Sequence, residues 1–243
     1  MSEFRGIPPG PNVGTQLKAL RRKKKAAEKV EQLEKISAPL PPEIYTGSAS
    51  PLAELTIAHV HEWFSSQGWA PFDYQLQVWK AFQQGHSGLL HATTGAGKTL
   101  AVWLGALLRM AQLPKQRGAA TRIMWITPMR ALAADSTKAL QKSAQALASD
   151  CDVALQTGDT DSAARAAILR KPPFALVTTP ESLTLMFTRA SSQPNLAKLQ
   201  ILVVDEWHEL IGNKRGVQLQ LAIARLAKLN PGLQVWGLSA TLG

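Results

Sequence analysis

The stretch Ala92-Thr93-Thr94-Gly95-Ala96-Gly97-Lys98-Thr99 follows a short apolar run at residues 88–91 and opens an apolar helical pattern at residues 98–110. A strand, a glycine-rich turn ending in Lys-Thr and a helix are the context of a phosphate-binding loop. Glycines let the backbone point its N–H groups at an anion, and the helix N-terminus adds the positive end of its dipole. The strict pattern has glycine where this chain has Ala92. The motif alone therefore leaves a chance glycine-rich turn as the alternative.

The loop predicts which residues hold a nucleoside triphosphate. Lys98 is long enough to reach the β- and γ-phosphates, and the Thr99 hydroxyl is a ligand for Mg²⁺. The residues expected to contact the nucleotide are Gln75, Thr94, Gly95, Ala96, Gly97, Lys98, Thr99 and Leu100.

An acidic pair supplies the other half of the predicted site. The β-branched run at residues 201–204 is typical of a buried parallel strand and ends in Asp205-Glu206. At the carboxyl edge of a parallel sheet, Asp205 is expected to face the phosphate loop and to hold the metal together with Thr99. Glu206 is expected to orient and deprotonate the attacking water, so Lys98, Asp205 and Glu206 are the predicted catalytic residues. The alternative is an ordinary acidic pair at a strand end.

A glutamine upstream of the loop indicates which base is bound. Gln75 closes the stretch Gly68-Trp-Ala-Pro-Phe-Asp-Tyr-Gln75, and its amide can pair with N6 and N7 of adenine. Phe72 is expected to flank the base. ATP and Mg²⁺ are therefore the expected cofactors. The alternative for Gln75 is a solvent-exposed residue at a helix start.

The rest of the pattern predicts an α/β fold with a central parallel sheet flanked by helices, because short apolar runs alternate with helical stretches. The predicted strands are residues 88–91, 122–127, 153–157, 174–178, 199–205 and 233–239. Helices are predicted at 57–66 and 74–83. Residues 217–229 fit both a strand and a helix, and we predict a helix because a crossover is needed before the next parallel strand.

Composition limits the class of protein and its partners. The chain has 243 residues, 45% of them hydrophobic and 18% charged, as in soluble globular proteins. Its longest nearly uncharged apolar stretch, residues 100–108, is far short of the ~20 residues of a membrane span. The N-terminus does not resemble a secretory signal, and the single Cys151 excludes an internal disulfide. We expect a reduced, cytoplasmic protein.

Charge and spacing divide the chain near residue 50. Residues 1–50 are predicted to be a basic extension, partly helical or disordered, that is either merely solvated or a phosphate-contacting arm. The formal net charge of +10 favours a polyanionic partner such as nucleic acid. Residues 51–243 form the predicted nucleotide-binding domain.

Further motifs follow the loop in a fixed order and together resemble the first motor domain of superfamily 2 DExH-box helicases. Thr127-Pro-Met-Arg130 resembles motif Ia and Thr179-Pro-Glu-Ser182 resembles motif Ib. Asp205-Glu-Trp-His208 resembles motif II, and Ser239-Ala-Thr241 resembles motif III. The resemblance covers about residues 60–243. It implies a RecA-like P-loop NTPase domain that hydrolyses ATP while acting on DNA or RNA–DNA hybrids.

Two features narrow the resemblance. Trp207 replaces the Ala, Val or Ile commoner in DExH boxes, and Lys214-Arg-Gly-Val-Gln218 follows the box. Both are similar to the large helicase-related family, in its bacterial ligase-associated DEXH-box helicase branch. That resemblance implies an ATP-dependent 3′-to-5′ translocase on single-stranded DNA, a role in DNA repair, and a ligase or nuclease encoded nearby.

Nucleic-acid contacts are expected where helices begin at the sheet edge. Thr127-Pro128 and Thr179-Pro180 each place threonine where an N-cap belongs and proline at the first helical position. Helix N-termini bind phosphates without regard to base identity. The predicted nucleic-acid-binding residues are Arg130, Thr157, Gly158, Thr179 and Ser182. The alternative is that these are only well-capped helices.

The last motif is expected to connect the two ligand surfaces. Ser239 and Thr241 are predicted to hydrogen-bond toward Asp205 or His208, and the resemblance implies that Ser239, Thr241 and His208 couple the phosphate state to nucleic acid. Six tryptophans are predicted to be core, namely Trp63, Trp69, Trp79, Trp103, Trp125 and Trp236. Trp207 is left open.

The sequence given ends two residues after Thr241. The resemblance implies a second RecA-like domain, in cis or in trans, that brings arginines to the γ-phosphate. Without it, we expect very slow hydrolysis. A non-catalytic module that binds nucleotide and nucleic acid is the main alternative, and a phosphate-loop transporter or kinase is the third.

Overall fold

The computed structural model describes residues 51–93, 95–114 and 118–240. The predicted extension at residues 1–50, Thr94 of the phosphate loop and Thr241 of the last motif lie outside this described part. Within it, no helix combines the length and the apolar character that crossing a membrane requires.

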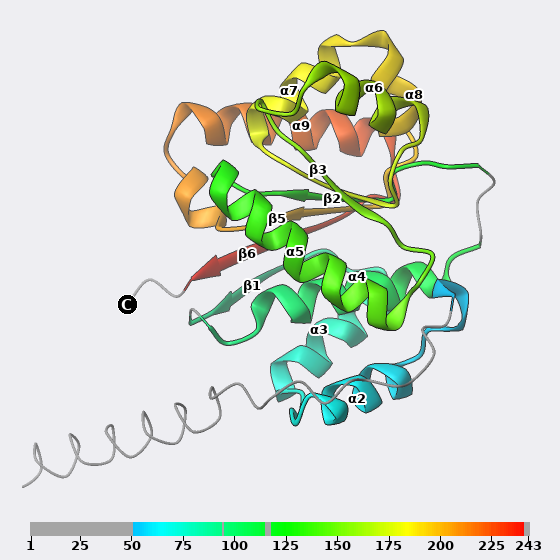
Figure 1. Ribbon diagram of the computed structural model, residues 1–243. Coiled ribbons are helices and arrows are strands. Elements are labelled where there is room, and N and C mark those ends of the chain that lie inside the picture. The colour runs from blue at the N-terminus through cyan, green and yellow to red at the C-terminus, as the bar shows by residue number, and fades with distance from the viewer. Residues whose placement is uncertain (1–50, 94, 115–117, 241–243) are drawn as a thin grey trace, which may run out of the picture. The chain divides into compact units, whose positions relative to one another are not determined.

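The centre of the domain is one parallel sheet (Figure 1). Its six strands are β1 (Gly88–Ala92), β2 (Ile123–Ile126), β3 (Val153–Gln156), β4 (Ala175–Thr178), β5 (Ile201–Val204) and β6 (Gln234–Ala240). They lie in the order β1-β6-β5-β2-β4-β3, and every pair is parallel. Each strand coincides with a predicted apolar run, so the predicted α/β class is confirmed.

Helices join the strands as parallel connections require. They are α2 (Ile57–Ser66), α3 (Asp73–Gln83), α4 (Lys98–Gln112), α5 (Arg130–Leu147), α6 (Ser162–Arg170), α7 (Pro180–Thr188), α8 (Gln193–Leu196) and α9 (Lys214–Leu229). Short 3-10 turns lie at Leu52–Glu54, Ala190–Ser192 and Trp207–Leu210, the last labelled η3. The ambiguous stretch at 217–229 is helical, as predicted.

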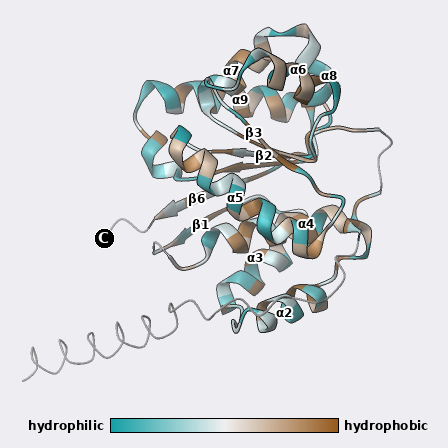
Figure 2. Ribbon diagram, viewed as in Figure 1, coloured by the Kyte–Doolittle hydropathy of each residue, from teal (hydrophilic) through white to brown (hydrophobic). Residues whose placement is uncertain are grey.

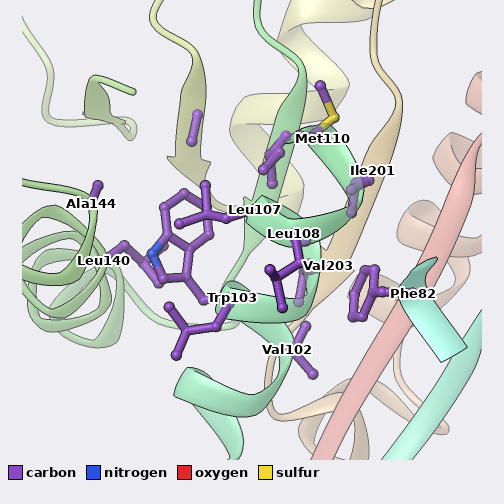
Figure 3. Packing of buried hydrophobic residues seen from close by; sticks show 14 of the residues in the cluster. Phe82, Val102, Trp103, Leu107, Leu108, Met110, Leu140, Ala144, Ile201 and Val203 are labelled. Atoms are coloured by element: carbon purple, nitrogen blue, oxygen red, sulfur yellow. The ribbon is translucent and has the colours of Figure 1, made fainter. Parts of the chain in front are cut away.

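Side-chain alternation divides the core into two layers. On β2, Ile123 and Trp125 pack with the layer under α2–α5, whereas Met124 and Ile126 pack with the layer under α7–α9. Figure 2 shows that the covering helices carry both hydrophobic and hydrophilic residues, as expected for helices that bury one face. Figure 3 shows the first layer, where Trp103 of α4 lies near Leu140 of α5.

Two local predictions are wrong. Trp69 is not core: it is 42% exposed in the turn after α2, with its ring edge-on to Trp63 at 6.0 Å. Thr127 is not an N-cap, because α5 begins at Arg130 with Met129 at the cap position. The Thr127 N–H donates to the Thr178 carbonyl at 3.0 Å, which extends the sheet pairing by one residue and delays the helix.

Candidate nucleotide site and nucleic-acid surface

The phosphate-binding loop joins β1 to α4 through two left-handed glycines. Gly95 has φ 76° and Gly97, the N-cap of α4, has φ 80°. A side chain in either conformation is strained, and a Cβ on Gly97 would also lie 3.0 Å from Gln75 Nε2. The conformation of the turn therefore requires glycine at both positions. This favours a phosphate-binding loop over a glycine-rich turn that arose by chance.

Lys98, the first residue of α4, folds its side chain back into the loop. Its Nζ donates to the carbonyls of Ala92 at 2.8 Å and Thr93 at 2.9 Å, and the residue is 9% exposed. Its positive charge is thus held inside the loop. A phosphate entering the loop would compete with two backbone carbonyls for this ammonium group.

Gln75 connects the upstream motif to the loop. Its Nε2 donates to the Gly97 carbonyl at 3.2 Å, and its Oε1 accepts from the Phe72 N–H at 2.9 Å. At 2% exposure it is not the solvent-facing glutamine of the alternative interpretation. Each amide atom keeps capacity for one more hydrogen bond, so adenine recognition stays a prediction.

Two aromatic rings flank this glutamine. Phe72 is 45% exposed and stacks on Tyr74 with ring centroids 5.8 Å apart. The Tyr74 hydroxyl donates to the Ala96 carbonyl, which ties α3 to the loop. Burial raises the pKa of Tyr74, so its hydroxyl stays a donor at neutral pH. The open face of Phe72 is a surface on which a base can stack.

Asp205 follows β5 at the carboxyl edge of the sheet. Its Oδ2 accepts from Trp125 Nε1 at 3.3 Å, and its Oδ1 accepts from the Glu206 N–H at 3.0 Å. The pKa of Asp205 is raised overall. Burial and then the neighbouring charge of Glu206 raise it, and they outweigh these two donors and the charge of Lys98, which lower it. The carboxylate is thus desolvated, and a cation bound beside it would favour its ionised form.

Glu206 stands in a strained conformation. With φ 46°, it is the only non-glycine residue with positive φ in the described ranges. Its Oε2 is buried and accepts no hydrogen bond from the described residues, although His208 Nδ1 lies 3.4 Å away. Strain and an unsatisfied buried oxygen are features that cluster at functional sites.

The predicted contact between the last strand and the box is confirmed for His208. Ser239 Oγ, on β6, lies 3.2 Å from His208 Nδ1 on η3. A hydrogen bond therefore links the end of β6 to the residue that faces Glu206. Whether it couples the two ligand surfaces stays a prediction, as does the role of Thr241.

This edge of the sheet offers few side chains that could bind a metal ion. The described residues contain no group of three or more His, Cys, Asp or Glu side chains that could hold an ion. Asp205 and Thr99 are the predicted protein ligands. A site with one carboxylate fits Mg²⁺, which keeps several waters and takes phosphate oxygens as further ligands. It does not fit an ion that needs an all-protein cage.

A second cluster of predicted residues meets at the ends of β3 and β4. Thr157, Gly158 and Ser182 line one small hollow, together with Arg165 and Arg189. Arg165 donates to the Gly158 carbonyl at 2.8 Å. Sequence reasoning missed these two arginines because neither the position of Arg165 on α6 nor that of Arg189 just after α7 shows, from the sequence, which way the side chain turns.

Arg130 lies over the same turn, at the first position of α5. It pairs with Asp159, and the two side chains are 61% and 68% exposed. A Cβ on Gly158 would lie 2.9 Å from Arg130 Nη2, so the guanidinium packs directly on this glycine. Arg130 and Gly158 are therefore the predicted contact residues that are open to solvent.

The hydroxyls of the second Thr-Pro motif are not open to solvent. Thr179 is the N-cap of α7 with Pro180 at its first position, as predicted. Thr179 and Ser182 are 4% and 5% exposed, and their hydroxyls bond to each other at 3.3 Å. Thr157 is likewise buried, at 6% exposure. In this conformation the cap of α7 engages the Thr179 and Ser182 hydroxyls, and contact of Thr157, Thr179 and Ser182 with nucleic acid stays a prediction.

Sequence reasoning also missed Arg215, in the first turn of α9. Its guanidinium donates to the Glu181 carboxylate of α7 and to the Pro128 carbonyl before α5. Burial alone would raise the pKa of Glu181, but the hydrogen bond from Arg215, with others, lowers it below the usual value. Arg215 thus ties both Thr-Pro motifs to the helix that follows the acidic box.

This sheet order, with a phosphate-binding loop after β1 and an Asp-Glu pair after β5, defines a RecA-like P-loop nucleotide-binding domain. The family model of DEAD/DEAH box helicases matches residues 72–243. The chain belongs to the DEAD/DEAH box helicase family, which confirms the resemblance to superfamily 2 helicases.

Among the proteins of known name that this chain resembles are helicases of the Lhr type. The chain is 35% identical over 209 residues to the Lhr helicase/probable uracil glycosylase of Mycolicibacterium smegmatis, covering 81% of this chain and 14% of that protein. It is 31% identical over 198 residues to the ATP-dependent helicase Lhr-Core of Methanothermobacter thermautotrophicus, covering 75% and 23%. The chain therefore spans less than a quarter of either relative.

A solved structure supports the same fold. The Mycobacterium smegmatis helicase Lhr bound to ssDNA and AMP-PNP superposes with a TM-score of 0.65 at 34% identity, over 80% of this chain and 26% of that one. The predicted RecA-like fold is confirmed by this match.

Proposed function

We propose that residues 51–243 form the first ATP-binding motor domain of an ATP-dependent helicase or translocase. The observation that carries the proposal is the sheet order β1-β6-β5, which puts the phosphate loop after β1 and the Asp205-Glu206 pair after β5 at the same carboxyl edge with one strand between them. The phosphate loop and the acidic pair are the two halves that phosphoryl transfer needs. Membership of the DEAD/DEAH box helicase family supports the same activity.

In this proposal each residue has one task. Lys98 exchanges its two carbonyl partners for the β- and γ-phosphates, a charge-assisted contact. Thr99 and Asp205 hold Mg²⁺, which supplies charge neutralisation at the phosphates. Glu206, with its unpartnered buried oxygen, accepts the proton of the attacking water. Gln75 recognises adenine.

The nucleic-acid substrate is proposed to be single-stranded DNA or a DNA–RNA hybrid, bound without sequence preference. Arg130, Thr157, Gly158, Thr179 and Ser182 would contact the nucleic acid, and Arg130 and Gly158 are the two that are open to solvent in this conformation. The single-stranded DNA in the Lhr structure at 34% identity supports this class of ligand. His208 and Ser239, with Thr241, would transmit the nucleotide state.

The wider assembly is proposed from the resemblance. A second RecA-like domain, in cis or in trans, would complete the site with arginines, and hydrolysis without it is expected to be slow. The ligase-associated branch, the 3′-to-5′ polarity, the role in DNA repair, a ligase or nuclease partner and a cytoplasmic location stay predictions.

A non-catalytic binding module is the second candidate. The observation that favours it is that Lys98 already donates to two loop carbonyls, so two of the three N–H groups of its ammonium are engaged. The two candidates differ in one measurable property. Only the motor hydrolyses ATP faster when single-stranded DNA is added.

Replacing Lys98 with alanine tests the nucleotide half of the proposal. The variant should bind a fluorescent ATP analogue at least about tenfold more weakly, because it lacks the charged contact to the phosphates. Single-stranded DNA binding should stay within about twofold. Fluorescence titration measures the first quantity and anisotropy of labelled DNA the second.

Lys80→Ala is the matched control, since Lys80 is an exposed lysine on α3 outside the loop. It should leave nucleotide binding unchanged. Wild-type affinity in Lys98→Ala would contradict the nucleotide site. Nucleotide and DNA binding without DNA-stimulated hydrolysis in the wild type would favour the binding module for the residues present here.

Arg130 and Asp159 form a pair whose two variants should act in opposite directions. Arg130→Gln should weaken binding of single-stranded DNA about three- to tenfold and reduce its salt slope by about one. Asp159→Asn should strengthen binding, because it removes the carboxylate that competes with phosphate for the guanidinium. DNA anisotropy at several salt concentrations measures both effects.

Arg170→Gln is the control, because Arg170 is exposed at the end of α6 and carries the same charge. It should change affinity by less than about twofold. Equal losses in Arg130→Gln and Arg170→Gln would mean that net charge alone, and not this turn, determines binding.

A further inference from the structure

One fully buried side chain reaches the acidic box from a neighbouring strand. Trp125 lies on β2 at 0% exposure, paired in register with Val203 of β5. It belongs to the core layer that α4 covers. Its indole Nε1 nevertheless donates to Asp205 Oδ2 at 3.3 Å. The core thus extends one hydrogen-bond donor to the predicted metal ligand.

Buried indoles elsewhere in the same layer show that this hydrogen bond is not a general requirement of burial. The Nε1 atoms of Trp79 and Trp103 are buried and have no hydrogen-bond partner among the described residues. Trp236 donates to a backbone carbonyl, that of His86, at 2.9 Å. Among these four tryptophans, Trp125 is the one whose N–H meets a carboxylate.

Both carboxylate oxygens of Asp205 therefore accept a hydrogen bond, one from a residue on β2 and one from the residue that follows it after β5. Oδ1 accepts from the Glu206 N–H and Oδ2 accepts from Trp125. Two fixed donors set the plane of a carboxylate and leave its remaining lone pairs in fixed directions. Partners of this kind orient metal ligands and raise metal affinity.

We propose that Trp125 is a positioning residue that orients the Asp205 carboxylate for a divalent cation bound with nucleotide. Trp125 touches neither ligand and acts only through Asp205. The inference rests on the proposed role of Asp205 as metal ligand. It predicts that the indole N–H affects the metal-dependent part of nucleotide binding and leaves the metal-free part unchanged.

The test compares affinities for a fluorescent, non-hydrolysable ATP analogue with excess Mg²⁺ and with EDTA. The dissociation constant in EDTA divided by the dissociation constant in Mg²⁺ isolates the contribution of the metal. Trp125→Phe keeps an aromatic ring and removes the donor, so the ratio should fall about tenfold. Affinity in EDTA should stay at the wild-type value, which a general loss of structure would not allow.

Trp103→Phe is the matched control, because it removes an equally buried indole whose N–H has no partner. Its ratio should equal that of the wild type. Asp205→Asn should abolish most of the Mg²⁺ enhancement, and adding Trp125→Phe to it should cause no further loss. Additive losses in the double variant would overturn the proposal, since they would mean that Trp125 does not act through Asp205.

The outcomes separate this inference from the proposed function. If Asp205→Asn retains the full Mg²⁺ enhancement, the proposed metal role of Asp205 fails. If Asp205→Asn loses it and Trp125→Phe does not, only the Trp125 inference fails. Trp125→Leu is the second variant, should phenylalanine not fold. Failure of both to give a cooperative thermal transition, with Trp103→Phe folded, would assign Trp125 to the core alone and overturn the inference.

Discussion

Replacing Gly216 with alanine is expected to be the most destabilising single-methyl change in the domain. A Cβ at position 216 would lie 1.7 Å from the backbone carbonyl oxygen of Leu210, so neither atom can move by rotating a side chain. The first turn of α9 would have to separate from η3. Leu210 is 2% exposed and belongs to the second core layer, which couples that movement to packing.

The expected cost is at least about 3 kcal/mol, at the upper end of overpacking effects. That corresponds to a fall in the melting temperature of about 6–12 °C for a domain of this size. Gly232→Ala is the control, because a Cβ there meets nothing within 4 Å. Circular dichroism melts of the two variants compare them directly. A Gly216→Ala variant as stable as Gly232→Ala would contradict the close approach of η3 and α9.

The fold was predictable because its signals are local. The run at 201–204, for example, is short and apolar with three β-branched residues of four, and the acidic pair Asp205-Glu206 follows it directly. The start of α9 was less predictable. Asn213 caps it by accepting a hydrogen bond from the Gly216 N–H at 2.9 Å, so α9 begins at Lys214, before the apolar pattern that starts at Val217.

Some residues of the candidate site could likewise be predicted from the sequence and others could not. Lys98, Asp205 and Gln75 could be selected because motif spacing identifies them. Trp125 and Arg215 could not, because their contacts join residues 80 and 87 positions apart in the sequence. A tryptophan in an apolar strand predicts core and nothing more. Its hydrogen bond to a carboxylate depends on strand order, which periodicity does not determine.

Thr127 shows a third kind of limit. A Thr-Pro pair after a strand predicts a capped helix, and at Thr179 this prediction is confirmed. At Thr127 the threonine N–H instead extends the sheet pairing by one residue, and the helix begins three residues later, at Arg130. The local signal is equal at both places, so only the pairing partner, the Thr178 carbonyl, decides between the two outcomes.

Glu206→Gln is expected to reduce ATP hydrolysis by about 10²–10⁴-fold, the range in which a general base contributes. Glutamine has nearly the same shape but cannot accept the proton of water. Nucleotide binding should stay within about threefold, because Glu206 is proposed to contact the attacking water and not the nucleotide. Product formation under single-turnover conditions, with single-stranded DNA present, measures the rate even where turnover is slow.

Glu209→Gln is the matched control for this change. Glu209 lies in the same turn and approaches the other nitrogen of His208, at 3.6 Å, but its side chain is 58% exposed. Both variants remove one negative charge near His208, so a general electrostatic effect would slow them equally. Of the two, only Glu206 combines a left-handed backbone with a buried carboxylate oxygen that has no donor among the described residues. Equal rates in the two variants would therefore remove Glu206 from the role of base, and a slow Glu206→Gln beside a normal Glu209→Gln would assign it that role.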